Sequence, residues 1–124
     1  MAAVPALDAA LRAHFGFEAF LPGQRELIEA VLAGRDALGI LPTAGGKSLA
    51  YQLPALLVRG TVLVVSPLIA LMKDQVDAFN RRHKGRAAAI HSNQTAAESA
   101  AALDSVQRGE AALLYVAPER LEVP

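Results

Sequence analysis

The chain contains no cysteine and no tryptophan, and aromatic residues make up only 5% of its 124 residues. Without cysteine it can form neither disulfides nor thiolate metal sites. An excess charge of either sign is missing as well, because 12 Lys and Arg residues balance 12 Asp and Glu residues. Any affinity for nucleic acid must therefore come from a local arrangement of residues rather than from net charge.

Long hydrophobic runs are also missing. The longest apolar stretch, residues 61–72, is broken by Ser66 and Pro67 and is too short to cross a bilayer. The first residues lack the basic start and long apolar run of a signal peptide. Hydrophobic residues still account for 53% of the chain, which is enough for the packed core of one domain at most. We therefore expect a cytoplasmic protein without a membrane segment.

Short apolar segments predict buried strands, because they show little of the polar alternation of half-exposed strands. These segments are Ala37–Leu41, Thr61–Ser66, Ala87–Ile90 and Ala111–Val116. Helices are expected around them at Leu7–His14, Gly23–Ala33, Ser48–Val58, Leu68–Asn80 and Thr95–Arg108. Strands that alternate with helices pair in parallel through right-handed crossovers. The pattern predicts an α/β fold with a parallel sheet flanked by helices.

The segment Leu41–Ser48 reads LPTAGGKS and lies between a predicted strand and a predicted helix. This context is typical of a phosphate-binding loop, in which successive backbone N–H groups and a helix N-terminus attract a polyanion. Lys47 would reach the outer phosphates, and Ser48 would offer its hydroxyl to Mg²⁺. Leu41 stands where the general pattern has glycine, and the alternative is a plain glycine-rich turn. The segment predicts that the chain binds a nucleoside triphosphate.

A family resemblance follows from segments that extend along nearly the whole chain. They are FGFEAFLPGQ at residues 15–24, the loop at residues 41–48, YQLPAL at residues 51–56, VVSPLIALMKDQV at residues 64–76 and YVAPERL at residues 115–121. In order and spacing they closely resemble the start of a RecQ-type DNA helicase, a superfamily 2 ATPase. The resemblance implies that residues 1–124 form a partial RecA-like (P-loop NTPase) lobe. Residues 15–24 would then be an adenine-reading loop, and residues 64–76 and 115–121 would face DNA.

For ATP, the resemblance implies contacts from residues of the phosphate loop, which are Thr43, Ala44, Gly45, Gly46, Lys47 and Ser48. Lys47 and Ser48 would be the catalytic members, with Ser48 holding Mg²⁺ through the nucleotide. Gln24 would read the adenine edge, because an amide offers a donor and an acceptor together; the alternative is an exposed helix glutamine. Phe17 and Phe20 are expected in the core or as support for this loop, unless one of them lies against the base.

For DNA, the resemblance implies contacts from Ser66, Pro67 and Leu68, where a strand ends and a helix begins, and from Arg120. Free N–H groups at such a strand end, and a hydroxyl, suit a DNA phosphate. Two alternatives remain open at this point. Ser66 could simply cap the helix, and Arg120 could pair with Glu119 or with a neighbouring carboxylate.

Two further segments carry weaker patterns. The basic run at residues 81–86 could touch phosphates, but a solvated helix end that complements the helix dipole is the favoured interpretation. Residues 91–94 follow a predicted strand at its carboxyl end and could line the path of DNA. Alternatively, Ser92 or Asn93 could cap the helix that starts at Thr95.

The chain departs from the family pattern at several points. Ala44 stands at a usual glycine, which would cost ~1–2 kcal/mol at positive φ and weaken nucleotide binding. Leu21 stands at a usual arginine, which removes a cation near the adenine. The chain reaches Pro124 without an Asp-Glu-Ala-His box or a second lobe. We therefore expect the opening piece of a larger helicase, with weak or absent ATPase activity and unpaired sheet edges.

The parent protein is expected to use ATP and Mg²⁺ to unwind DNA with a 3′-to-5′ bias. Its substrate would be single-stranded or forked duplex DNA, its role DNA repair and recombination, and its place the nucleoid if the source is a bacterium. One alternative is a nucleotide- or DNA-binding module without catalysis. A less favoured one is a DEAD-box-like RNA helicase, whose members read differently at FLPGQ and SPLIALMKDQ.

Overall fold

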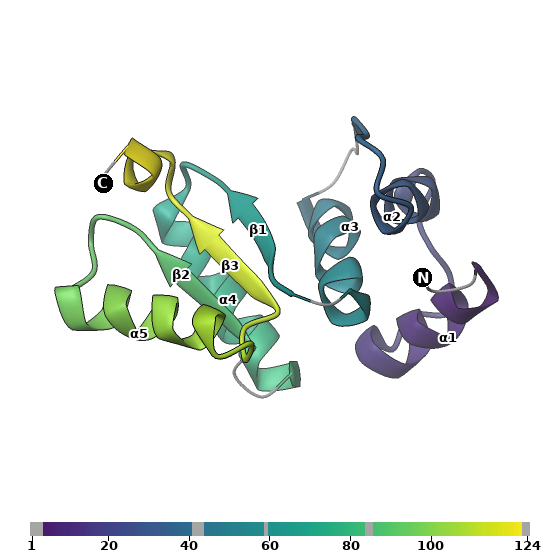
Figure 1. Ribbon diagram of the computed structural model, residues 1–124. Coiled ribbons are helices and arrows are strands. Elements are labelled where there is room, and N and C mark those ends of the chain that lie inside the picture. The colour runs from purple at the N-terminus through teal and green to yellow at the C-terminus, as the bar shows by residue number, and fades with distance from the viewer. Residues whose placement is uncertain (1–3, 41–43, 59, 84–85, 123–124) are drawn as a thin grey trace. The chain divides into compact units, whose positions relative to one another are not determined.

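The computed structural model describes residues 4–40, 44–58, 60–83 and 86–122. The chain forms two compact units, Met1–Arg59 and Gly60–Pro124, each with its own packing. The first unit is helical, and the second holds a small sheet with helices against it (Figure 1). No helix in these described ranges has both the length and the apolar character needed to cross a membrane.

The first unit contains α1 (Val4–Phe15), α2 (Gln24–Leu32) and α3 (Ala44–Leu57). Apolar side chains spaced three or four residues apart form a stripe on each helix, and these stripes meet in a common core. The buried core residues are Leu7, Leu11, Phe15, Ile28, Leu49 and Leu53. Asp8 of α1 and Arg25 of α2 add an ion pair of 3.0 Å between two of the helices. The helices predicted for this part of the chain are confirmed, with bounds that differ by a few residues.

The strand predicted at Ala37–Leu41 is wrong for the part that the structure describes. Residues 35–40 form no strand, and Leu41 lies outside the described residues. Leu38 is 90% exposed and Ile40 is 89% exposed. None of the strands in the structure pairs with this segment, and an extended apolar segment gains little without ladder partners and a covered face.

The second unit is built on a three-stranded parallel sheet of β1 (Val62–Val65), β2 (Ala87–Ile90) and β3 (Leu113–Val116). The strand order is β1-β3-β2, so the last strand in the chain is the central one. In register, Val62 and Ala87 both lie opposite Leu113. The parallel α/β prediction is confirmed, and β2 has the predicted bounds.

Helices α4 (Ile69–His83) and α5 (Ala96–Gln107) pack on this sheet, and a short 3₁₀ helix, η1 (Pro118–Glu122), follows β3. In Figure 1, α5 lies in front of the sheet and α4 lies behind it. The core on the α5 side is formed by Ile90, Ala102, Leu114 and Val116. Side chains alternate between faces along a strand, so the neighbouring Ala89 and Tyr115 are directed to the α4 side.

The strands differ in how well they are covered. Every residue of β3 is buried, as predicted for a strand with helices on both faces. The edge strand β1 alternates instead, with Leu63 54% exposed and Val65 50% exposed. The prediction of complete burial is therefore wrong for β1, because α5 packs against β2 and β3 and leaves one face of β1 open.

Asn80, near the end of α4, fastens this helix to the start of β2. Its Oδ1 accepts a hydrogen bond from the Ala87 N–H at 2.8 Å, and its Nδ2 donates to the Ala87 carbonyl at 3.1 Å. One side-chain amide therefore satisfies both backbone groups of an edge-strand residue, as a neighbouring strand would.

The N-terminus of α5 is capped by Thr95, not by Ser92 or Asn93 as one of the sequence alternatives supposed. The Glu98 N–H donates to the Thr95 hydroxyl at 3.1 Å, and the Thr95 N–H donates to the Glu98 carboxylate at 2.9 Å. This reciprocal pair is a capping box, which satisfies two backbone donors at the helix start.

The capping box should make stability depend on pH. Hydrogen bonds from the backbone and side chain of Thr95 lower the pKa of Glu98 below its usual value of 4.5. Because the folded pKa is the lower one, the contribution of Glu98 is present above about pH 4.5 and is lost as pH falls through the folded value. We expect urea titrations of the Glu98→Gln variant to show a smaller loss of stability over this acid range than the unmutated chain. Equal acid dependence in the two proteins would contradict the assignment.

Candidate functional site

The predicted phosphate loop meets the described structure at the start of α3. Thr43 lies outside the described residues, and α3 begins at Ala44 rather than at Ser48 as predicted. The backbone N–H groups of Gly45 and Gly46 therefore belong to the first turn, where N–H groups have no acceptor within the helix. Such a turn, together with the helix dipole, favours an anion.

Two side chains of the predicted site follow in the same helix. Lys47 is exposed, and Ser48 is half-buried. A long exposed ammonium group can move to meet phosphate oxygens beyond the helix end. Within the described residues, no group of three or more His, Asp or Glu is placed to hold a metal ion. The predicted role of the Ser48 hydroxyl in binding Mg²⁺ stays a prediction.

Ala44 does not have the backbone strain that was expected from its place at a usual glycine. The residue is helical, and a right-handed helix has negative φ. Positive φ at this position is therefore absent, and the expected penalty for a side chain does not apply to this conformation.

Gln24 is buried, with only 3% of its surface exposed, so the alternative of an exposed helix glutamine is wrong. The Leu21 N–H donates to its Oε1 at 2.7 Å, and the Gln24 N–H donates to the Leu21 carbonyl at 3.1 Å. Gly23 makes this tight turn possible, because its φ of 87° suits glycine alone. The adenine-reading role stays a prediction.

The aromatic residues of the same loop divide between two roles. Phe20 packs partly buried against the core of the first unit, which confirms its predicted supporting role. Phe17 is 54% exposed, so its predicted place in the core is wrong and its ring is open to a ligand. Leu21, at the position where the family has arginine, is 53% exposed.

Arg25 is a residue that the sequence reasoning missed. Its guanidinium lies over the Phe20 ring at 5.4 Å, and its Nη2 donates to Asp8 at 3.0 Å. Its Nη1 is buried without a hydrogen-bond partner among the described residues. Its position directly after Gln24, the predicted adenine-reading residue, is the sequence signal that could have identified it. Arg25 places a cation at the loop that lacks arginine at position 21.

In the second unit, the residues that are predicted to contact DNA lie at one edge of the sheet, because parallel strands all end on the same side. The Ser66 N–H donates to the Val116 carbonyl at 3.1 Å, and the Ala117 N–H donates to the Ile90 carbonyl at 3.0 Å. Backbone hydrogen bonds thus hold the segments after all three strands in register. The carboxyl edge of a parallel sheet is where ligands of α/β proteins commonly bind.

Ser66 has a local role at this edge. Its Oγ accepts a hydrogen bond from the Leu68 N–H at 3.2 Å, directly before α4 begins at Ile69. Pro67 and Leu68 are exposed. This bond closes a short turn before the helix and does not reach the N–H groups within α4 that an N-cap would satisfy, so both the capping role of Ser66 and its contact with DNA stay predictions.

Arg120 lies half-buried in η1, and its Nε is buried without a hydrogen-bond partner among the described residues. The neighbouring Glu119 instead accepts a hydrogen bond from the Ser92 hydroxyl at 3.1 Å. This bond links the segment after β2 to the segment after β3. The alternative in which Arg120 pairs with Glu119 is not observed.

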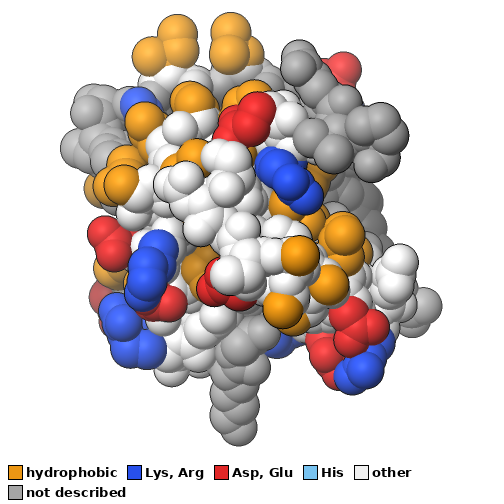
Figure 2. Space-filling model, turned by 90° about the vertical axis from the view of Figure 1, so that its left-hand side faces the viewer, with side chains coloured by type: hydrophobic (Ala, Val, Ile, Leu, Met, Phe, Trp, Pro, Cys, Tyr) orange, Lys and Arg blue, Asp and Glu red, His pale blue; other side chains and the backbone are white. Residues whose placement is uncertain are grey.

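Charge is distributed evenly over the visible surface. Figure 2 shows Lys and Arg side chains interspersed with Asp and Glu, without one continuous basic patch. Arg81 and Arg82 lie exposed in the last turn of α4, as the solvated helix end predicts. Lys73 and Asp77 pair at 2.9 Å on the same helix. A polyanion would therefore be held by individual contacts rather than by a general field.

Comparison with known proteins identifies the class. The model of the DEAD/DEAH box helicase family matches residues 21–123, and the chain belongs to this family. It is 44% identical over 118 residues to "Probable ATP-dependent DNA helicase RecS" of Bacillus subtilis, covering 95% of this chain and 23% of that protein. It is 46% identical over 121 residues to "ATP-dependent DNA helicase RecQ" of Synechocystis, covering 98% and 25%. The RecQ protein of Pasteurella multocida is 47% identical over 116 residues, covering 94% and 18%.

These relatives confirm the RecQ-type resemblance and fit the partial RecA-like α/β fold. The chain spans about a quarter or less of the length of the relatives named above. What they do as whole proteins therefore comes to this chain as a proposal.

Proposed function

We propose that this chain is the nucleotide-binding part of a RecQ-type, ATP-dependent DNA helicase. The observation that carries this proposal is the helix start at Ala44–Gly45–Gly46, followed by Lys47 and Ser48, in a chain of the DEAD/DEAH box family. The parent protein would bind single-stranded or forked duplex DNA and unwind the duplex with a 3′-to-5′ bias, in the cytoplasm and, if the source is a bacterium, at the nucleoid.

The residues of the first unit would divide the work of binding ATP. The N–H groups at the start of α3 and the Lys47 ammonium would hold phosphate oxygens, and Ser48 would bind Mg²⁺. When bound, Mg²⁺ would neutralise charge on the phosphates. Gln24 would read the adenine edge through its side-chain amide, which offers a donor and an acceptor together.

The residues of the second unit would bind the DNA backbone. Arg120 is half-buried in η1, and guanidinium groups bind phosphate through two N–H groups at once. Ser66, Pro67 and Leu68 form the adjacent start of α4. These contacts would fix the position of the strand without reading its sequence.

The decisive test is calorimetry of ATP with Mg²⁺ on the unmutated chain and on Lys47→Ala. A hydrogen bond to a charged group contributes about 1.5–3 kcal/mol, so the variant should bind ATP at least about tenfold more weakly. Arg12→Ala is the control, because Arg12 is an exposed cation in the last turn of α1; it should bind like the unmutated chain.

Two other results would change the conclusion. Absence of ATP binding by the folded, unmutated chain would overturn the proposal. Binding that depends on Lys47, without hydrolysis when DNA is added, is the result expected of this chain and leaves the conclusion unchanged. A preference for RNA over DNA of the same sequence would favour the RNA helicase alternative.

A further inference from the structure

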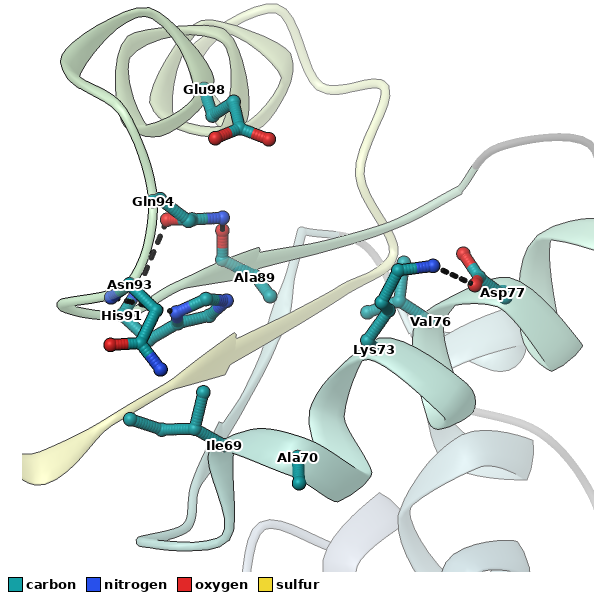
Figure 3. Close-up of a pocket in the computed structure, with 10 residues that line it drawn as sticks. All are labelled: Ile69, Ala70, Lys73, Val76, Asp77, Ala89, His91, Asn93, Gln94 and Glu98. Atoms are coloured by element: carbon teal, nitrogen blue, oxygen red, sulfur yellow. Dashed lines mark hydrogen bonds and ion pairs between the residues drawn. The ribbon is translucent and has the colours of Figure 1, made fainter.

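A pocket of about 430 Å³ lies at the carboxyl end of β2, between α4 and the segment that leads into α5. Figure 3 shows His91 and Gln94 on one side of it and Lys73, Val76 and Asp77 of α4 on the other. Ligand pockets of proteins commonly start at about 300 Å³. The cavity is therefore large enough for a small planar group, and it lies at the edge that we assign to DNA.

The segment at residues 91–94 is held in place without any ligand. The Gln94 Nε2 donates to the Ala89 carbonyl at 2.7 Å, and its Oε1 accepts from the His91 N–H and the Ser99 hydroxyl, each at 3.1 Å. The Asn93 N–H donates to the His91 Nδ1 at 3.2 Å. The wall is preformed, which lowers the entropic cost of binding.

The residues that line the pocket provide apolar surface and, in addition, a polar side chain that makes no hydrogen bond to other described residues. Ile69, Val76 and Ala89 supply apolar surface. The side-chain amide of Asn93 makes no hydrogen bond within the described residues, and it offers a donor and an acceptor together. The His91 ring adds a flat surface, on which a base or another ring can stack.

Charge decides against a phosphate in this pocket. Lys73 is its one described cation, and its hydrogen bond to Asp77 raises the Lys73 pKa above the usual value. Lys73 and Asp77 offset each other, and the Glu98 carboxylate leaves an excess of negative charge. An anion would be repelled, whereas a neutral ring with amino groups could donate to the carboxylates.

We propose that this pocket receives one unstacked nucleobase of the DNA strand bound along the carboxyl edge of the sheet. The inference rests on the proposed function. The Ser92–Glu119 hydrogen bond joins the pocket wall to η1, which carries the predicted phosphate contact Arg120. A strand held through its phosphates at η1 can therefore turn a base toward Asn93 and His91. With such a contact, the affinity for DNA would fall when the base is missing. With contacts to the DNA backbone alone, the affinity would not depend on the base.

The test fills the pocket from a position that tolerates a larger side chain. Ala70 lines the pocket but is exposed on α4, so Ala70→Phe should fold normally. Ala78→Phe is the matched control, because Ala78 is also exposed on α4 and does not line the pocket. Affinity would be measured with a fluorescein-labelled oligodeoxyadenylate, whose bases carry an amino group, and with the same oligonucleotide carrying single abasic sites. Ala70→Phe, or the abasic site at the bound position, should weaken binding about tenfold, and Ala78→Phe should not.

Two further measurements separate this inference from the proposed function. Arg120→Ala reports the phosphate contact, and a ¹H–¹⁵N NMR titration with free adenosine or thymidine reports the pocket through the amides of Ala89 and Asn93.

If Arg120→Ala weakens oligonucleotide binding while Ala70→Phe and the abasic sites do not, the base pocket is wrong and the DNA function stands. If no oligonucleotide binds but nucleosides shift the pocket amides, the pocket stands and the DNA function falls. If neither occurs, both fall. Shifts caused by N-acetyl-arginine amide in place of nucleosides would overturn the inference in favour of a protein partner.

Discussion

Leu53→Ala is expected to lower the free energy of unfolding by about 2–5 kcal/mol. Leu53 lies in α3 with none of its surface exposed, in the core that also contains Leu11 and Ile28. Truncation removes apolar contacts from three helices and leaves a cavity that a close-packed interior refills only in part. Urea unfolding followed by circular dichroism would measure the change.

Leu38→Ala is the matched control for this prediction. Leu38 belongs to the same unit but is 90% exposed, so its truncation should change stability by no more than about 0.5 kcal/mol. The pair also tests the correction to the sequence prediction. If residues 37–41 formed a buried strand, Leu38→Ala would be as costly as Leu53→Ala, and that result would contradict the structure.

Asn80→Ala is expected to cost about 1–3 kcal/mol of stability, because it leaves two backbone groups of Ala87 without their partner. Ala87 is only 6% exposed, so water can replace the lost hydrogen bonds only in part. Native-state hydrogen exchange adds a local readout: the amide of Ala87, now bonded to the Asn80 Oδ1 at 2.8 Å, should lose its protection first.

Asn93→Ala is the control, because Asn93 is exposed and its side chain makes no hydrogen bond within the described residues. It should leave stability within about 0.5 kcal/mol of the unmutated chain. Equal stability losses for the two variants would mean that the Asn80 amide does not hold β2.

The sheet could be predicted from the sequence because each of its strands is an apolar run that follows the end of a helix. Gly60 and Gly109 mark two of these ends, and both have positive φ in the structure. The capping box of α5 could also have been found, since Thr95 and Glu98 have its spacing. The sequence pattern was sufficient in two situations. In the capping box, the two partners are only three residues apart. In the sheet, each apolar segment has a neighbouring strand with which it pairs.

What the sequence could not show depends on partners that local pattern does not specify. Residues 37–40 have the composition of a buried strand but no strand beside them in the structure. Gln24 looks like a solvent-facing helix residue, yet its amide turns back to the Leu21 N–H. In the candidate site, the chemistry of Lys47, Ser48 and Arg120 was visible in the sequence, whereas the pocket beside Asn93 requires α4 and the segment after β2 to be brought together.

The order β1-β3-β2 has a consequence for how the chain acquires its structure during synthesis. β1 and β2 do not pair with each other, and each finds its ladder partner only in β3, which comes last in the chain. A ribosome would therefore release both earlier strands, with open backbone edges, before the strand that joins them exists. Contacts between distant parts of a chain form slowly because loop closure must precede them. Within this part of the chain, the need for chaperones should thus be greater before Leu113–Val116 leaves the exit tunnel than after it, since unpaired edges in that interval favour aggregation.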